Sequence, residues 1–272
     1  MFSGRWILVT AMIVAASSGA FAEDERAWTD KAEFSLVVTG GNSKSTVVSF
    51  SNQFVYKWTD SKLTIDASAL KADTTSRTAS NVDGTLSIAQ VEEITAEKYL
   101  LGGKYDHKIH EGAFWYVLGQ WGRDRLAGID NRYNGGAGMG YRLVKTERQE
   151  VDSEVGFNFT KEEYAGAGTK SSATFGSARG FLGYKRKLSG TSELTSSLEL
   201  LQNLDDPADL RAIFIAGISA NINSHLALKV SYTINYDGQP VEQTLTAPGF
   251  DPVTFVFNTT DTILAASLLV NF

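Results

Sequence analysis

The residues that could do chemistry in this sequence are few, and they lie beside turns. The chain has 272 residues with three histidines, His107, His110 and His225, and no cysteine. A cysteine nucleophile is therefore excluded. His107 and His110 could bind a metal ion together with Asp106 and Glu111. We favour the alternative of a solvent-facing turn, because the segment offers neither a thiolate ligand nor a rigid support.

Phosphate transfer and hydrolysis lack a matching motif. The glycine-rich residues 135–140 lie inside a strand pattern and not before a helix, so they do not predict a phosphate-binding loop. Membrane-embedded hydrolases place a histidine with serine or aspartate partners toward the outer rim, whereas the histidines here lie beside turns that we assign to the periplasmic side. The sequence therefore predicts no catalytic residue, no metal and no cofactor. An outer-membrane enzyme is kept as an alternative hypothesis.

The first residues have the form of an export signal. Arg5 precedes the apolar residues 6–16, and Ala-Phe-Ala at residues 20–22 has the small-x-small form of a cleavage site. That run is shorter than the roughly 20 residues that a membrane-spanning helix needs. A buried N-terminal helix is the alternative. We expect residues 1–22 to be a signal peptide and residues 23–272 to form the mature domain.

Composition limits the class of partner and of fold. The formal net charge is −6 without any basic run, which argues against nucleic acid as a partner. Zero cysteine suits an exported barrel, because a barrel closed by its own hydrogen bonds needs no disulfide. Export without a second apolar helix leaves three classes, namely a soluble periplasmic protein, a secreted protein or a β-barrel.

Apolar and polar residues alternate after residue 30. Residues 225–236 place apolar side chains on every second position, over about the length of a tilted membrane strand. The apolar face carries Leu226, Leu228, Val230, Tyr232, Ile234 and Tyr236, and the polar face carries Lys229, Ser231, Thr233 and Asn235. A soluble sandwich also alternates, but its strands usually run for about 5–6 residues, whereas those expected here run for roughly 10–15.

The pattern predicts an all-β fold, a transmembrane antiparallel β-barrel of about twelve strands. The expected strands are residues 31–39, 45–58, 62–73, 95–108, 113–124, 131–144, 149–161, 171–186, 191–202, 209–220, 225–236 and 259–272. Residues 74–94 could add a hairpin and raise the count to fourteen. Short turns and long loops alternate along the chain, with a tight turn at residues 40–43 as the exception.

Charges of both signs fall on the face that we expect to line the lumen. The expected inward set is Glu33, Asp66, Asp106, Asp152, Glu154, Glu193, Glu199, Lys57, Lys98, Lys104, Arg132, Arg142, Arg179, Lys185, Arg211 and Lys229. Burying unpaired charges costs several kcal/mol per ion. Either these residues pair in a network that closes the barrel, or water fills a narrow, gated or plugged channel.

The segment around residue 130 combines charges with glycines. Asp124, Arg125, Asp130 and Arg132 flank a short outer loop, and we expect ion pairs among them to pin it; ligand binding is the alternative. Alternate glycines within residues 135–140 share the inward face. They leave room for long side chains from neighbouring strands or for a close bend.

The last residues alternate and stop on an aromatic. The outward face there carries Leu264, Ala266, Leu268, Val270 and Phe272. This looks like the signal by which barrel-assembly machinery recognises outer-membrane proteins, with strand addition at an exposed edge and Phe272 in a pocket. We expect that machinery and outer-membrane lipid as partners, and the Gram-negative outer membrane as the location.

Residues 99–141 resemble the salt-induced outer-membrane protein family. The matching features are Lys104-Tyr105-Asp106, Asp124-Arg125, Gly128-Ile129-Asp130, Arg132, the glycine-rich residues 135–141 and the early turn at residues 39–43. Strand pattern and terminal aromatic extend the resemblance across nearly the whole mature chain. The resemblance implies the barrel and its location, not a reaction.

Three hypotheses of function follow. The first is a structural or stress-response envelope barrel with a charged, largely closed lumen. The second is a narrow diffusion channel for small solutes or ions, and the third is the outer-membrane enzyme. The charged inner face motivates the first two, and conductance would separate them.

Overall fold

A computed structural model of the protein describes residues 27–39, 44–82, 85–165, 171–240, 242–245, 251, 253–256 and 258–272. The expected signal peptide at residues 1–22 and the tight turn at residues 40–43 lie outside the described residues.

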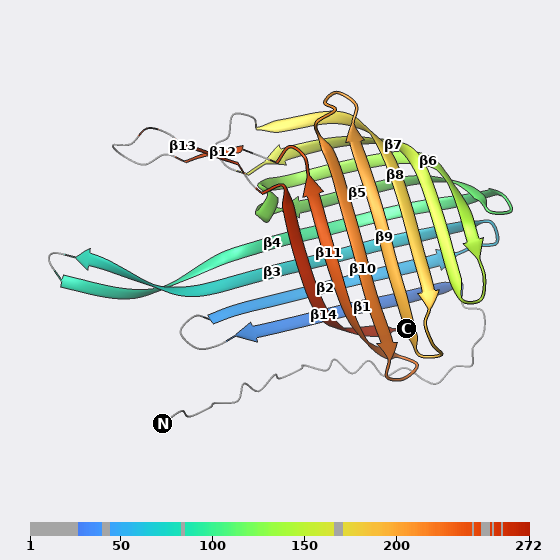
Figure 1. Ribbon diagram of the computed structural model, residues 1–272, viewed down its shortest axis with the longest axis horizontal. Helices are drawn as coiled ribbons and strands as arrows, with labels where there is room; N and C mark the ends of the chain where they lie inside the picture. The colour runs from blue at the N-terminus through green and yellow to red at the C-terminus, as the bar shows by residue number, and fades with distance from the viewer. Residues whose placement is uncertain are drawn as a thin grey trace.

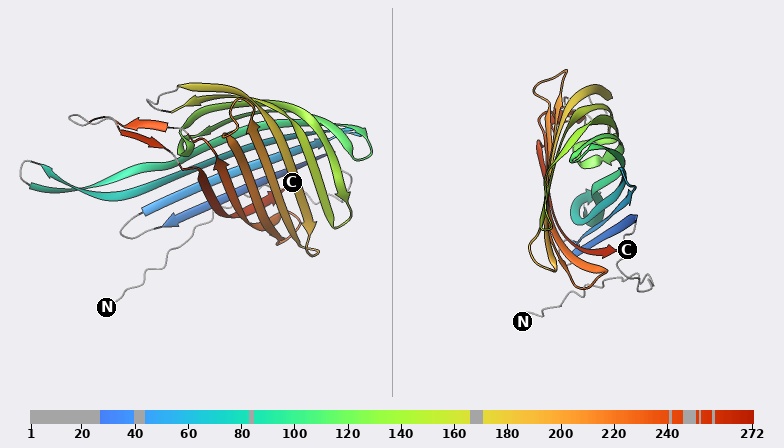
Figure 2. Two further views of the ribbon diagram at one scale, coloured as in Figure 1. Left: turned by 45° about the horizontal axis from the view of Figure 1, so that its top comes forward. Right: turned by 90° about the vertical axis from the view of Figure 1, so that its right-hand side faces the viewer.

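Twelve antiparallel strands form a closed barrel, as the sequence predicts (Figure 1). The barrel strands are β1 (Trp28–Thr39), β2 (Lys44–Lys57), β3 (Ser61–Val82), β4 (Thr85–His110), β5 (Ala113–Asp124), β6 (Ile129–Lys145), β7 (Gln149–Tyr164), β8 (Ser172–Lys187), β9 (Ser192–Asn203), β10 (Leu210–Asn221), β11 (Leu226–Asp237) and β14 (Thr260–Asn271). Each pairs with its neighbour in sequence, and β1 closes the sheet against β14. Figure 2 shows that the barrel is flattened in cross-section.

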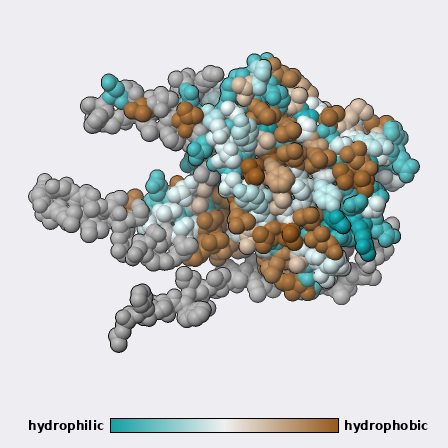
Figure 3. Space-filling model, in the orientation of Figure 1, coloured by the Kyte–Doolittle hydropathy of each residue, from teal (hydrophilic) through white to brown (hydrophobic). Residues whose placement is uncertain are grey.

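The alternation of side chains explains why the sheet closes. On β11, Leu228 and Val230 are more than half exposed on the outside, whereas Lys229 between them points inward and bonds Glu33. The outer surface therefore carries exposed apolar side chains, which Figure 3 shows as brown patches over the strands. Such a surface suits a lipid environment, where every backbone polar group must be bonded within the sheet. The described part of the chain contains no helix that is long and apolar enough to cross a membrane.

The connections at the two ends of the barrel differ in length. One end, here called the turn end, carries the short turns at residues 58–60, 111–112, 146–148, 188–191 and 222–225. The opposite end, the loop end, carries the longer connections, including the short 3-10 helix η1 (Arg125–Ala127) and the segment between β11 and β14. Gly112 and Gly128 close connections with φ of 85° and 69°, a left-handed conformation that glycine adopts without strain.

The stretch at residues 74–94 extends an existing hairpin. β3 and β4 continue past the other strands and project from the loop end, and the register shifts between Ala72 and Asp73 (Figures 1 and 2). The suggestion of fourteen barrel strands is therefore wrong. A separate hairpin, β12 (Glu242–Leu245) with β13 (Val253–Val256), lies within the β11–β14 connection and stays outside the barrel.

The closing seam is shorter than the other interfaces. β14 pairs with β11 along its length, from Thr260 to Val270. Against β1, by contrast, the register covers only residues 268–271 opposite residues 31–34. Among the described residues, 35–39 of β1 and 263–267 of β14 therefore carry no partner strand on this side. The seam is paired at the turn end and unpaired toward the loop end.

Aromatic side chains gather on the outside near the turn end. The rings of Tyr105 and Trp115 lie 5.6 Å apart, and those of Tyr56 and Trp58 lie 4.6 Å apart. Rings of this kind, apolar with a polar edge, are typical of the boundary between hydrocarbon and headgroups. Trp58 and Trp115 are 50% and 38% exposed on this outer face.

Candidate functional site

The lumen holds a central cluster, defined as Lys104, Tyr116, Glu154, Arg179 and Glu199. Arg179 is 6% exposed, and its guanidinium binds Glu154 and Glu199 with N–O distances of 2.8 Å each. It also donates to the hydroxyl of Tyr116 at 3.0 Å. A planar guanidinium with several donors can bind two carboxylates at once, so both acids are neutralised by one residue.

Lys104 extends the central cluster toward the turn end. Its ammonium pairs with Glu154 and lies 2.8 Å from Asp106, which Lys62 also contacts at 2.9 Å. The same ammonium sits 4.8 Å from the centre of the Tyr116 ring. Lys104 lies on β4 and Glu154 on β7, two strands that are not neighbours. The contact therefore crosses part of the lumen instead of joining two neighbouring strands.

Glycines make the contact between Tyr116 and Arg179 across two intervening strands possible. Tyr116, Gly138, Gly156 and Arg179 stand opposite one another in register on β5, β6, β7 and β8. A Cβ at Gly156 would lie 2.3 Å from the Tyr116 hydroxyl oxygen, and one at Gly138 would lie 2.6 Å from it. The phenol lies across both glycines and reaches Arg179 with no exposed surface. This confirms the expectation that inward glycines leave room for long side chains.

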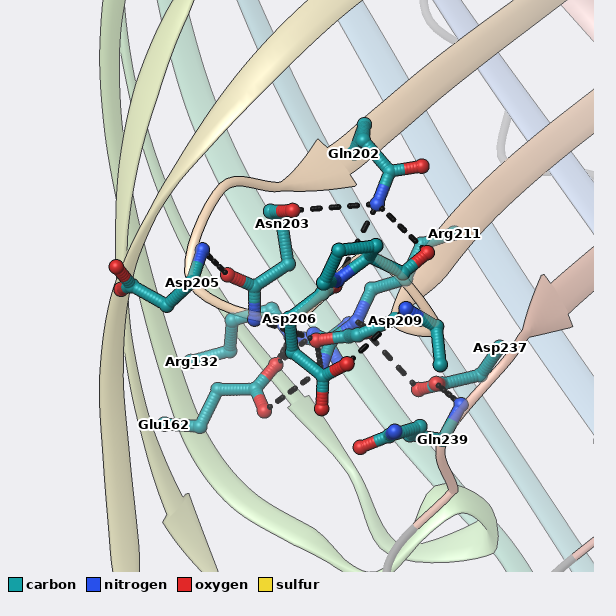
Figure 4. Close-up of polar contacts among 12 residues, drawn as sticks. Arg132, Glu162, Gln202, Asn203, Asp205, Asp206, Asp209, Arg211, Asp237 and Gln239 are labelled. Carbon is teal, nitrogen blue, oxygen red and sulfur yellow. Dashed lines mark hydrogen bonds and ion pairs between the residues drawn. The ribbon is translucent and has the colours of Figure 1, made fainter.

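A second group, the loop-end cluster, consists of Arg132, Glu162, Asp209, Arg211 and Asp237. Figure 4 shows Arg132 and Arg211 converging on Glu162, which is 1% exposed. Arg211 also lies 2.9 Å from Asp209 and 3.7 Å from Asp237. The arginines come from β6 and β10 and the glutamate from β7, so this cluster again spans strands that are not all adjacent.

A cavity of about 520 Å³ occupies the lumen between the two clusters and the loop end. Glu199 and Phe181 belong to its lining, and Arg132 and Arg211 border it on the side of the loop-end cluster. The central cluster therefore lies at its turn-end boundary. The wall of β1, β2 and β3 contributes mainly small groups such as Ser51.

The expected inward charges are largely paired. Lys185 meets Glu193 at 3.1 Å, and Lys229 meets Glu33 at 2.6 Å. Arg142 bonds Asp152 at 2.8 Å, separately from the central cluster. Of the two alternatives that the sequence leaves open, ion pairing is thus observed for these charges on the lumen face.

The four charges expected to pin a loop are divided among different partners. Asp124 pairs with Lys98 at 2.7 Å and caps η1 by accepting from the Ala127 amide at 3.3 Å. Arg125 meets Glu97 at 3.1 Å and Asp130 at 3.9 Å. Arg132 points into the lumen and belongs to the loop-end cluster. Arg125 and Asp130 are thus the only expected pair that meets among the described residues.

Glu162 and Tyr116 are central to the two clusters and were missed by the sequence interpretation. The strand expected from the sequence ends at residue 161 and does not include Glu162. The inward alternation of Glu154, Asn158 and Glu162 continues past that point and is the signal that could have extended the strand. Tyr116 carried no such signal, because a tyrosine fits the lipid side equally well.

The histidines bond locally. His107 Nδ1 lies 2.8 Å from the Ser61 hydroxyl, on the outer face among the aromatic rings. His110 Nδ1 lies 3.0 Å from the Glu111 carbonyl. Within the described ranges, no group of three or more histidine or acidic side chains is arranged to hold a metal ion.

Several solved barrels are similar to this chain over most of their length, at low sequence identity. The translocator domain of the autotransporter NalP from Neisseria meningitidis is 11% identical, with 92% of this chain and 89% of that chain covered and a TM-score of 0.47. An outer membrane channel from Pseudomonas putida F1 is 13% identical, with 94% and 99% covered and a TM-score of 0.47. The NanC porin is 8% identical, with 90% and 98% covered and a TM-score of 0.43.

No curated protein matches the sequence. The family model described as "Protein of unknown function, DUF481" matches residues 32–272, almost the whole barrel, and the chain therefore belongs to this family.

Proposed function

We propose that the protein is a structural barrel of the Gram-negative outer membrane, with a lumen that the central cluster keeps closed to ions. This proposal rests on one observation: the ion pairs and the hydrogen bond of the central cluster cross the lumen between strands that are not neighbours. The turn end would face the periplasm and the loop end the exterior, the arrangement usual for bacterial barrels. Outer-membrane lipid would cover the exposed apolar strands.

The energetics favour a closed lumen at this level. Glu154 and Arg179 are 5% and 6% exposed, so neither can exchange its partner for water without a rearrangement. Removing one partner of such a buried pair costs about 3–5 kcal/mol, because the other charge is left without compensation. A hydrated path through the central cluster would require several of these pairs to open together. Thermal fluctuation alone would open such a path rarely.

A role under osmotic stress is the finer part of the proposal. It rests on the resemblance of residues 99–141 to the salt-induced family and on the mechanical character of a cross-braced barrel. A strain that lacks the protein should lose viability or envelope integrity at raised salt, and the wild-type chain should restore it. A chain with Arg179→Met should restore it poorly if bracing is what matters. Equal growth of the deletion strain at every salt concentration would remove this role.

The experiment for the barrel itself has two steps. The folded, detergent-extracted protein should migrate faster on a gel before boiling than after it, as closed barrels do. In planar bilayers it should then give no conductance steps up to high voltage. Unchanged gel mobility, or a circular dichroism spectrum that is mainly helical, would contradict the barrel fold. Regular conductance steps would contradict only the proposal that the lumen is closed.

A narrow channel is the second candidate, because the cavity reaches the loop end. Ala127 and Asn258 line the cavity at the loop end, and Glu199 of the central cluster lines it on the side of the turn end. If this cluster gates a channel, Arg179→Ala should raise conductance strongly, whereas Arg142→Ala, outside the cluster, should not. If both variants stay silent while remaining heat-modifiable, the channel hypothesis fails.

A further inference from the structure

The cavity in the loop-end half of the lumen has an unusually apolar wall for the inside of a charged barrel. Leu100, Leu201, Ile213, Ile215 and Ile263 line it from β4, β9, β10 and β14. Water in contact with such a surface is displaced favourably by an apolar group of matching size. A pore that only conducts ions has no need of this lining. The wall therefore fits an apolar molecule or the apolar part of one.

The charges around the cavity are satisfied with one exception. Lys98, Arg123, Arg132 and Arg211 line it, and each has an acidic partner, the most distant being Glu97 at 4.0 Å from Arg123. Asp261 lines it as well and is half-buried, but within the described residues it has no ion pair and no side-chain hydrogen bond. The nearby connection, residues 238–259, contains neither lysine nor arginine. A bound anion would find each of these bases already paired, whereas a bound cation would meet the Asp261 carboxylate, which only the more distant charges of Lys98 and Asp124 influence.

The unpaired part of the β1–β14 seam borders this cavity. Ile263, which lines the cavity, belongs to the segment of β14 that lacks a described partner on the side of β1, and Asp261 lies two residues away on the same strand. Extending the register of the paired part would place Val37 opposite Ala265, yet these residues do not pair. Val37 lies on the inward-facing side of β1, as Glu33 does, yet it is 49% exposed. The sheet is therefore unpaired beside Ala265, next to the cavity lining and on the lipid-facing circumference of the barrel.

We propose that this cavity binds a small amphipathic cation that partitions into the membrane. The apolar body would pack on Leu201, Ile213 and Ile263, and the cationic group would pair with Asp261. The molecule would enter sideways through the β1–β14 seam, because the unpaired strand segments there meet the membrane directly, whereas the loop end of the cavity meets water. This inference rests on the proposed location of the barrel in a membrane, but it adds a ligand class that a structural barrel does not require.

Calorimetry with matched probes tests the ligand class. The full barrel is reconstituted in phosphatidylcholine nanodiscs and titrated with octyltrimethylammonium, octyl sulfate or octanol, and empty nanodiscs supply the background. We expect the cation to bind at least about tenfold more tightly than the sulfate, a difference typical of one partly desolvated ion pair. Equal affinities for cation and anion, or no heat beyond that of empty nanodiscs, would overturn the proposal.

Substitutions locate the binding. Asp261→Asn should weaken octyltrimethylammonium binding about tenfold, whereas Glu147→Gln, the same change of charge in an exposed turn, should leave it unchanged. Ile215→Trp should fill the cavity and abolish binding of the cation and of octanol. Full binding by both Asp261→Asn and Ile215→Trp would place the ligand elsewhere and overturn the proposal. Heat-dependent gel mobility of each sample reports separately whether the barrel has formed, so failure of the barrel is distinguishable from failure of the site.

A crosslink tests the route. The chain has no cysteine, so Val37→Cys with Ala265→Cys introduces a single possible disulfide. A disulfide needs Cα atoms within about 7 Å, so its formation would hold the two strands together. We expect oxidation to slow octyltrimethylammonium association at least about tenfold and reduction to restore it, because the path through the seam would be blocked. An oxidised protein that binds at the original rate would overturn lateral entry.

Discussion

The two sides of the lumen are built in different ways. From β4 to β10, here called the ion-paired wall, long charged side chains reach over glycines and lock together, as Arg179 does with Glu154 and Tyr116. From β14 through β1 and β2 to β3, the small-residue wall, the inward positions are mostly short groups such as Ser35, Ser51 and Ser267. One side fills its half of the lumen with side chains, and the other leaves space.

The difference shows how one closed sheet can be both rigid and accessible. Hydrogen bonds between strands close the barrel, but they do not determine its cross-section, which depends on what connects strands that are not neighbours. The ion-paired wall has such connections and the small-residue wall has few, and the short β1–β14 seam lies within the latter. The place where the sheet can open therefore lies on the side that has few connections between strands that are not neighbours.

Breaking the centre of the ion-paired wall should have the largest effect on stability. Arg179→Met removes the cation that Glu154 and Glu199 share, so that Glu154 keeps only Lys104 and Glu199 loses its ion pair, and we expect a loss of about 3–5 kcal/mol in the free energy of unfolding. Urea unfolding in lipid vesicles, followed by gel mobility, measures this loss. Arg148→Met, in an exposed turn, is the matched control and should change little. Equal stability of both variants would mean that the central cluster does not stabilise the barrel.

The loop-end cluster should be the next most sensitive point. Glu162→Gln removes the one carboxylate that Arg132 and Arg211 share, while Asp209 and Asp237 still accompany Arg211. Because part of the compensation remains, we expect a loss of about 1.5–3 kcal/mol, the range for hydrogen bonds to charged groups. The same unfolding assay applies, with Glu147→Gln as control. A loss as large as that of Arg179→Met would show that Asp209 and Asp237 do not compensate.

The glycines under Tyr116 test whether the ion-paired wall depends on close packing. In Gly156→Ala the new methyl group would collide with the Tyr116 hydroxyl and with the backbone oxygen of Ala137, at 2.3 and 2.6 Å. Overpacking of this kind costs about 1–3 kcal/mol. Gly135→Ala, on β6 with no atom within 4 Å of the new Cβ, should be neutral or slightly stabilising. If both substitutions cost the same, the glycines serve only the strand backbone.

The architecture was predictable because period-two alternation is a local signal. All twelve barrel strands were expected within a few residues, apart from the extensions of β3 and β4, since each strand repeats the same pattern between turn residues. The extensions were missed because residues 74–94 mix small, polar and apolar side chains without a clear period. Whether the β3–β4 hairpin continues past the barrel depends on how its two strands pair with each other, and the sequence of one strand alone does not show this pairing.

The clusters were predictable in kind but not in detail. Alternation assigned Arg179, Glu154 and Glu199 to the same face, so a paired network was a sound expectation. Which acid meets which base depends on the stagger between strands, which connects Lys104 on β4 to Glu154 on β7. The short β1–β14 pairing could not be predicted either, because an alternating pattern gives the length of each strand but not the number of residues that pair with the neighbouring strand.

The smallest effect should come from the ion pair next to the small-residue wall. Lys229 and Glu33 are 2.6 Å apart, closer than most pairs of the ion-paired wall, yet Glu33 lines the cavity and keeps 17% of its side chain exposed. Water in the cavity can solvate Glu33 once Lys229 is gone, so we expect Lys229→Met to cost only about 1 kcal/mol. Unfolding of Lys229→Met, Glu33→Gln and the double variant should give a coupling energy of similar size. A loss that approaches the one for Arg179→Met would mean that the cavity excludes water, and that distance alone, rather than burial, ranks the ion pairs of this lumen.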